Sequence, residues 1–291
     1  MSGKTLLAFG HSHLSALSRA HKTYVEEDPE GAPPVELHWL GEKQLQPNFE
    51  LVGLGKVKAA RQAGEEAHAR LMSRLRTPGA RDIAKGDKVR VLSEKLETHL
   101  RELLAERDPA GIVLACMGNE YNTLGMLRHP EPFDFDLPGS DLPLEEGVTQ
   151  IPYALMKAQV RATAERNALL FWRFFNDVAG DVPIYMLPPP PPIASEAHIR
   201  DFPGAFADRV ADYGISPVTL RRKMWLLYCE VLDEAVAGTN TTLVALPPAV
   251  FTDGCLSRQF WQSDPTHGNV DYGMVILDHV CSMALDEEAE A

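Results

Sequence analysis

The chain has 291 residues, 45% of them hydrophobic, and carries a formal net charge of −13. Such an acidic chain lacks the clustered Lys and Arg side chains that displace counterions from a phosphate backbone, so we expect no nucleic-acid partner. The length and apolar content suffice to bury one α/β core, and we predict a single domain over residues 1–285 followed by an acidic tail at 286–291.

Cysteine usage and the N-terminal segment bear on the cellular compartment. The four cysteines are widely spaced and form no C-x-x-C pair, which indicates buried free thiols rather than a disulfide framework. No apolar run approaches the roughly 18 residues of a membrane span, and residues 1–17 lack a basic segment followed by a cleavage site. We therefore expect a cytoplasmic protein without a membrane span.

Five short apolar runs predict strands, and helical patterns lie between them. In chain order the predicted strands are residues 5–9, 35–40, 111–116, 182–187 and 242–246. Helical spacing recurs in three segments, at Val89, Leu92, Leu96, Leu100 and Leu103, at Leu220, Met224, Leu227 and Val231, and at Val270, Met274, Leu277 and Cys281 after a candidate N-cap, Asn269. Apolar strands alternating with helices predict a parallel sheet covered on both faces, which is a three-layer α/β/α fold.

Three other segments have distinctive compositions. Residues 128–152 are rich in Pro, Gly, Asp and Glu and predict a long loop, inserted after the third strand, that shapes or covers a site. The run F-W-R-F-F at 171–175 indicates a helix packed on the sheet rather than an aromatic binding stripe. Five prolines at 188–192 directly follow the fourth strand, which favours a stiff wall beside the site over a ligand for a peptide-binding domain.

Polar motifs follow three of the predicted strands. G-H-S-H at 10–13 follows the first, M-G-N-E-Y-N at 117–122 follows the third, and D-P-T-H-G-N at 264–269 follows the fifth by a longer path. Because the carboxyl ends of parallel strands meet at one edge of a sheet, we expect Ser, Asn, Asp and His side chains to gather there.

The first motif places a serine where a strand turns into a helix. Gly10 permits a tight bend, and a helix starting near Leu14 would put the Ser12 amide at a helix N-terminus, where an N–H can face a developing oxyanion. A serine hydroxyl becomes a good nucleophile when a neighbouring base takes its proton. The alternative is that Ser12 only caps the helix.

The other two motifs offer the remaining parts of such a site. Asp264 precedes His267 by three residues, so the carboxylate could accept the Nδ1 proton while Nε2 faces Ser12. Asn119 directly follows a predicted buried strand, where its side-chain amide could donate to an oxyanion. The alternatives are a capped turn with a surface histidine at His267 and an ordinary turn at Asn119.

These blocks resemble those of the SGNH, or GDSL-like, serine hydrolase superfamily. The resemblance implies a flavodoxin-like sheet, Ser12 as nucleophile and first oxyanion donor, Asn119 as side-chain oxyanion donor, and Asp264 with His267 as orienting acid and general base. The chain departs from the family pattern where His11 replaces the acidic residue before the serine and Glu120 replaces the aspartate after the asparagine. The family's second-block glycine should follow the second strand region, where L-V-G-L-G offers Gly53 and Gly55, and we favour Gly55 because a charged helical pattern follows it.

We therefore expect a serine-dependent ester hydrolase acting on a small ester or acylated carbohydrate, with no cofactor and no metal. Residues placed to line the substrate are His11, Glu120 and Trp261. Transfer of the acyl group to a sugar hydroxyl is one alternative, and a catalytically silent glycan-binding module is another. A metallophosphoesterase is the third, because His11, His13 and a later G-N-E faintly resemble metal-binding blocks, although the set of ligands is incomplete.

Overall fold

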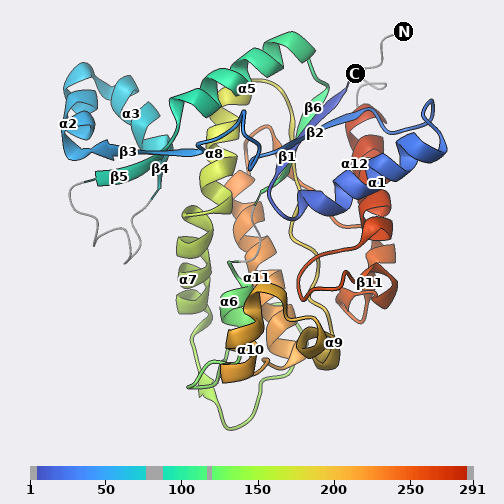
Figure 1. Cartoon of the computed structure of the whole chain (residues 1–291). Coiled ribbons are helices and arrows are strands. Elements are labelled where there is room, and N and C mark those ends of the chain that lie inside the picture. The colour runs from blue at the N-terminus through green and yellow to red at the C-terminus, as the bar shows by residue number, and fades with distance from the viewer. Residues whose placement is uncertain (1–4, 77–87, 117–119, 287–291) are drawn as a thin grey trace.

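The computed structural model describes residues 5–76, 88–116 and 120–286, and a five-stranded parallel sheet lies at its centre (Figure 1). The strands lie side by side in the order β10-β9-β6-β1-β2. Their bounds are β1 (Leu6–Gly10), β2 (Val35–Trp39), β6 (Gly111–Ala115), β9 (Ile184–Met186) and β10 (Thr241–Leu243). Each overlaps a predicted strand, and the order has flavodoxin-like topology, so the predicted fold class is confirmed.

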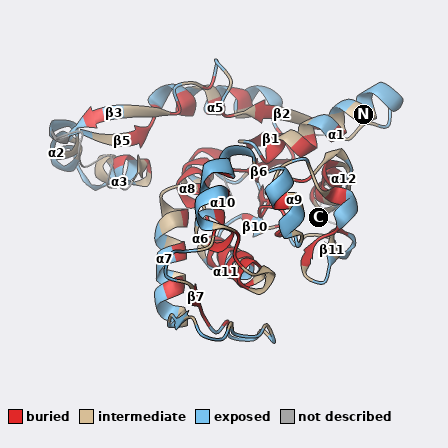
Figure 2. Ribbon diagram, turned by 60° about the horizontal axis from the view of Figure 1, so that its bottom comes forward, coloured by how far each residue is buried: buried red, intermediate tan, exposed pale blue. Residues whose placement is uncertain are grey.

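The alternation of side chains along β1 divides the core between the two faces of the sheet. Leu7 and Phe9 point to the face covered by α5, α7, α8 and α11, whereas Leu6 and Ala8 point to the face covered by α1 and α12. The bounds of these helices are α1 (Leu14–Glu27), α5 (Glu94–Arg107), α7 (Tyr153–Glu165), α8 (Ala168–Ala179), α11 (Val218–Val236) and α12 (Val270–Asp286). Figure 2 shows their buried faces turned toward the sheet.

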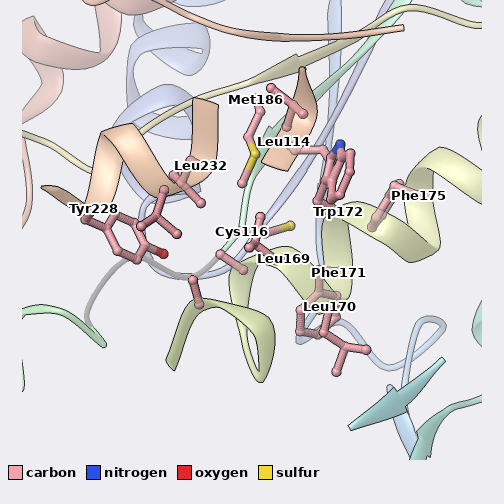
Figure 3. Close-up of a cluster of buried hydrophobic side chains, with 14 of the residues drawn as sticks. Leu114, Cys116, Leu169, Leu170, Phe171, Trp172, Phe175, Met186, Tyr228 and Leu232 are labelled. Atoms are coloured by element: carbon pink, nitrogen blue, oxygen red, sulfur yellow. The ribbon is translucent and has the colours of Figure 1, made fainter. Parts of the chain in front are cut away.

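The larger of the two cores is built from bulky side chains of β6, β9, α8 and α11 (Figure 3). The aromatic run at 171–175 lies in α8, where Phe171, Phe174 and Phe175 are almost fully buried. Trp172 is also buried and donates its indole N–H to Thr241 Oγ1 at 2.9 Å. The expected core role of this run is therefore confirmed.

A small antiparallel unit stands beside the main sheet, at the far side of α5 and α8 from α1 in Figures 1 and 2. It consists of β3 (Phe49–Gly53), α2 (Leu54–Ala63), α3 (Glu65–Ser73), β4 (Leu75–Arg76) and β5 (Lys88–Leu92). Val52, Leu71 and Val91 form its own apolar cluster. No pattern in the sequence predicted this unit.

The prediction of a helix from Val89 onward was wrong for its first residues. Val89 and Leu92 lie in β5, and α5 begins only at Glu94, where the Ser93 hydroxyl accepts from the Leu96 amide at 3.2 Å. The alternating β-branched residues of K-V-R-V-L fit a strand, although two of them also fall at helical spacing. By contrast, Asn269 caps α12 as expected, because its side-chain oxygen accepts from the Tyr272 amide at 3.1 Å.

The segment 128–152 is anchored to α11. It contains the short parallel pair β7 (Phe133–Asp134) and β8 (Thr149–Gln150), and Asp134 forms a fully buried ion pair with Lys223 at 2.9 Å. Figure 2 places β7 at the end of the molecule away from α1. The structure therefore shows this segment packed on α11, whereas its composition and position predicted a loop over the site.

The remaining elements are short. They are α6 (Asn122–Gly125), α9 (Glu196–Asp201), α10 (Ala207–Tyr213), β11 (Phe251–Thr252), β12 (Cys255–Leu256) and three 3-10 turns at Gly204–Phe206, Pro248–Val250 and Arg258–Phe260. The four cysteines are free thiols, three of them buried and Cys229 partly so, as predicted. Across the described ranges, every helix is too short or too polar to cross a bilayer.

Candidate active site at the carboxyl edge of the sheet

The G-H-S-H turn leaves the sheet at a point of close backbone approach. A Cβ atom on Gly10 would lie 2.6 Å from the carbonyl oxygen of Ala115 in β6, so only glycine fits there. The His11 amide continues the ladder by donating to the same oxygen at 3.2 Å, and the chain then turns, with the Leu14 amide donating to the His11 carbonyl at 2.9 Å. This places Ser12 just beyond the end of β1.

Ser12 does not cap the helix that follows it. The N-cap of α1 is His13, which makes no side-chain cap hydrogen bond. Ser12 is exposed, and within the described part of the chain neither its hydroxyl nor its amide donates a hydrogen bond. The capping alternative is therefore wrong, and Ser12 is an exposed residue just before the N-cap residue of α1.

The D-P-T-H turn holds the Asp264 carboxylate against the His267 ring. Oδ1 of Asp264 accepts from the amides of Thr266 and His267, each at 2.8 Å, and both carboxylate oxygens lie 3.0 Å from His267 Nδ1. A carboxylate only accepts hydrogen bonds, so Nδ1 carries the proton and Nε2 is left as the basic nitrogen. The arrangement is that of an orienting acid and a general base.

The electrostatics of Asp264 favour its ionised form. Burial alone raises the pKa of this carboxyl, but the hydrogen bonds from the His267 ring and from the two backbone amides outweigh burial and leave the pKa below its usual value. Asp264 is therefore charged at neutral pH and can stabilise a positive charge on His267.

A contact between two histidine rings brings the D-P-T-H turn to the G-H-S-H turn. The centroid of the His267 ring lies 4.6 Å from that of His13, the residue after Ser12, at an interplanar angle of 39°. His267 Nε2 is buried and has no hydrogen-bond partner among the described residues, so Ser12 Oγ is not bonded to it in this structure. The two turns are neighbours, but the hydrogen bond between His267 Nε2, the candidate base, and Ser12 Oγ, the candidate nucleophile, is not formed.

The two histidines that flank Ser12 are uncharged at neutral pH. Burial lowers the pKa of His13 to about 3, with a further contribution from neighbouring His267, and burial lowers the pKa of His11 to about 4. The His11 ring packs edge-on against Phe171 at 4.9 Å. His13 shares with Pro188, Pro189 and Pro190 a cavity of about 10 Å³, which is roughly the volume one water needs.

The third-strand motif lies partly outside the described residues. Asn119 belongs to the segment 117–119, and its predicted role stays a prediction. Glu120 accepts from the Tyr228 hydroxyl at 2.8 Å and from the Ala168 amide at 3.3 Å, so α11 and α8 hold its side chain. These contacts direct Glu120 into the packing between helices.

The structure does not bring Gly55 to Ser12. Gly55 lies in α2, in the small unit on the other side of α5 from α1 (Figures 1 and 2). Gly41 instead follows β2 at the edge where Ser12 follows β1, because Gly10 pairs with Trp39 and each residue lies two positions further on. The Gly41 amide, like that of Ser12, donates to no described group. Gly41 directly follows the second predicted strand, a position that the choice between Gly53 and Gly55 did not consider.

Trp261 and a histidine outside all predicted motifs brace the D-P-T-H turn. The Trp261 indole donates to the Leu256 carbonyl at 2.7 Å, and its ring packs against His198 with centroids 4.9 Å apart. His198 Nε2 lies 2.9 Å from the Gln262 carbonyl and 3.3 Å from that of Asp264, so this nitrogen carries a proton and donates. No sequence motif surrounds His198 in its short helix α9, which is why sequence reasoning passed over it.

Within the described ranges, no group of three or more His, Cys, Asp and Glu side chains has the arrangement of a metal site.

The chain matches no family model and no curated protein. Among solved structures it is weakly similar to the periplasmic domain of a lipopolysaccharide acetyltransferase from Salmonella ser. Paratyphi A. The TM-score is 0.40 at 9% sequence identity, and the alignment covers 100% of this chain and 85% of that one. A likeness at this level does not assign the chain to a family.

Proposed function

We propose that this chain is a serine-dependent acyl-transfer enzyme that acts on an ester. Ser12 is the nucleophile, His267 the general base and Asp264 the group that orients the base. The observation that supports the proposal is the contact between the His13 and His267 rings, because it joins the turn that carries the Asp264–His267 pair to the turn that carries exposed Ser12, and His267 Nε2 has no partner among the described residues.

The reaction proceeds through a covalent intermediate. Ser12 Oγ attacks the ester carbonyl while His267 Nε2 takes the hydroxyl proton, and the tetrahedral intermediate then collapses as His267 returns that proton to the leaving alcohol. An acyl group remains on Ser12. This step requires side-chain rotation that brings Ser12 Oγ within hydrogen-bond distance of His267 Nε2. Catalytic hydrogen bonds commonly tighten in this way when substrate binds.

Backbone amides supply the stabilisation of the oxyanion in this proposal. The Ser12 and Gly41 amides are both without a partner in the described structure and follow neighbouring parallel strands. Preorganised donors of this kind stabilise charge that develops on the carbonyl oxygen. Asn119 is the third donor proposed, on the strength of the sequence pattern alone.

The acyl-enzyme then passes its acyl group to water or to an alcohol. Hydrolysis by water gives an esterase, and capture by a sugar hydroxyl gives an O-acyltransferase. Ser12 is exposed, so both acceptors have access to the intermediate. Neither route needs a metal or an organic cofactor.

Product analysis with an acetyl ester tests the proposal. We expect wild-type protein to release p-nitrophenol from p-nitrophenyl acetate and Ser12→Ala to fall to the uncatalysed rate. Acetate as the product assigns hydrolysis, whereas an acetylated product that forms when sugar alcohols are added assigns transfer. Full turnover by Ser12→Ala would refute the proposal.

Two further outcomes would each assign the chain to a different class of protein. Wild-type protein that folds, binds glycans and turns over no ester would be a silent binding module. Hydrolysis of phosphate esters that stops with EDTA and returns with Mn²⁺ would indicate a metallophosphoesterase.

A further inference from the structure

Three arginines surround one buried carboxylate between the small unit and α5. Glu97 in α5 is only 5% exposed. Its oxygens lie 2.5 Å from Arg70 Nη2, 3.0 Å from Arg74 Nη1 and 3.1 Å from Arg101 Nε. One carboxylate balances one guanidinium, so this cluster carries two surplus positive charges in a chain whose net charge is −13.

The three arginines differ in how much of their hydrogen-bonding capacity the protein uses. Arg74 is buried and donates through Nε and Nη2 to the Leu92 carbonyl, at 3.0 and 2.7 Å, besides contacting Glu97. Among the described residues, the guanidinium groups of Arg70 and Arg101 form hydrogen bonds and ion pairs only with Glu97, and their side chains are 65% and 52% exposed. Each guanidinium has five N–H donors, so most of the donors on these two side chains have no partner among the described residues.

These donors line a hollow of about 510 Å³, a size typical of small-molecule sites. Its charged lining consists of four cations against two carboxylates: Lys56, Arg70, Arg74 and Arg101 against Glu94 and Glu97. Lys56 is paired with Glu94 at 3.1 Å and Glu50 at 3.6 Å, so Lys56 adds no unpaired positive charge to the hollow.

A second hollow of about 380 Å³ shares the three arginines but adds Glu66 and Asp177. Three arginines and three carboxylates line it, so the charges of its lining sum to zero. Glu66 and Asp177 line only the second hollow, so an anion in the first hollow lies against the arginines without these two carboxylates beside it.

We propose that the first hollow binds a phosphate group carried by a small molecule. A phosphate dianion matches two surplus charges, and guanidinium forks bind phosphate oxygens in bidentate fashion. Glu97 holds the three guanidinium groups in place, so little side-chain entropy is lost on binding. The site is independent of the proposed chemistry at Ser12.

Calorimetric titration of the full chain with inorganic pyrophosphate, at constant ionic strength, tests the proposal. We expect saturable binding, weakened about 10-fold or more by Arg101→Gln and by Arg70→Gln, because each removes charge-assisted hydrogen bonds. Arg101→Lys keeps the charge and loses the planar fork, so its affinity should lie between those of wild type and Arg101→Gln.

The control is Arg161→Gln, which removes the same charge from an exposed pair with Glu234. It should bind pyrophosphate like wild type. Because Arg70 and Arg101 lie at the surface, their variants should fold, and circular dichroism checks this. Absence of saturable binding to wild type, or equal weakening by Arg161→Gln, would overturn the proposal.

Discussion

Asp264 combines two functions in one short turn. Its carboxylate fixes the backbone of the D-P-T-H turn through two amides and fixes the His267 tautomer through Nδ1. The sequence spacing alone pointed to the second contact, because three residues of a turn bring the carboxylate back to the ring. The first contact ties the carboxylate to the backbone of the turn as well as to the ring.

Replacing Asp264 by Asn separates these functions. An amide oxygen can still accept from the turn amides, but the side chain no longer carries the negative charge that stabilises protonated His267. We expect kcat for an ester to fall about 10³- to 10⁴-fold, with a small change in melting temperature. Steady-state kinetics and thermal melts measure both. Unchanged kcat in folded protein would remove Asp264 from the mechanism.

His13 should make stability depend on pH. The unfolded chain takes up a proton on this imidazole near pH 6.5, whereas in the folded state its pKa is lowered to about 3 by burial. Between these values the unfolded state binds more protons, so stability falls as the pH falls. The loss is about 1.36 kcal/mol per pH unit for one such group, or about 2 kcal/mol from pH 6.5 to 5.

The variant His13→Phe keeps a ring against His267 but cannot titrate. Urea denaturation at pH 6.5 and pH 5 should show a smaller loss of stability for this variant than for wild type. His11 titrates in both proteins, so its contribution cancels in the comparison. Identical losses would contradict the buried, neutral state of His13.

At the level of elements, the buried Asp134–Lys223 pair fastens the segment 128–152 to α11. Both side chains are 0% exposed, and Asp134 also accepts from the amides of Phe135 and Glu145, each at 2.8 Å. The composition of the segment predicted a loop but not its attachment. An isolated Asp and Lys 89 residues apart carry no sequence signal of pairing.

Breaking this pair should be costly. Lys223→Met leaves a buried carboxylate without its cation, and we expect a loss of about 3 to 5 kcal/mol in the free energy of unfolding. The double variant Lys223→Met with Asp134→Asn removes the uncompensated charge and should recover part of that loss. Urea denaturation measures both.

The exposed pair of Arg161 and Glu234 provides the comparison, since Arg161→Met should cost less than about 1 kcal/mol. If the double variant Lys223→Met with Asp134→Asn loses as much free energy of unfolding as Lys223→Met and Asp134→Asn measured singly and added together, a direct ion pair between the two residues is contradicted.

At the scale of the whole molecule, the central sheet was predictable because each of its strands is a short, continuous apolar run. The pattern could not reveal the small unit, where β3 and β5 pair across 35 or more positions and β5 also fits helical spacing. The same unit bears on the choice of glycine: Gly55 follows β3, a strand outside the main sheet, whereas Gly41, the donor that we propose, follows β2 within it.

In the candidate site, too, local motifs were predictable from the sequence and long-range contacts were not. Ser12, Asp264 and His267 were found from local motifs at strand exits, and Asp264 and His267 do form a pair in the structure. The contact between His13 and His267 and the bracing by His198 depend on tertiary packing, so the motifs gave no sign of them.

Covalent labelling with a fluorophosphonate tests the proposed role of Ser12 most directly, because the probe reacts with a serine that a neighbouring base has activated. We expect wild-type protein to be labelled at Ser12, located by peptide mass mapping, and Ser12→Ala to take up no label. His267→Ala, folded by circular dichroism, should be labelled far more slowly. Labelling of Ser12 at the wild-type rate in His267→Ala, or of another residue in its place, would contradict a Ser12 nucleophile activated by His267.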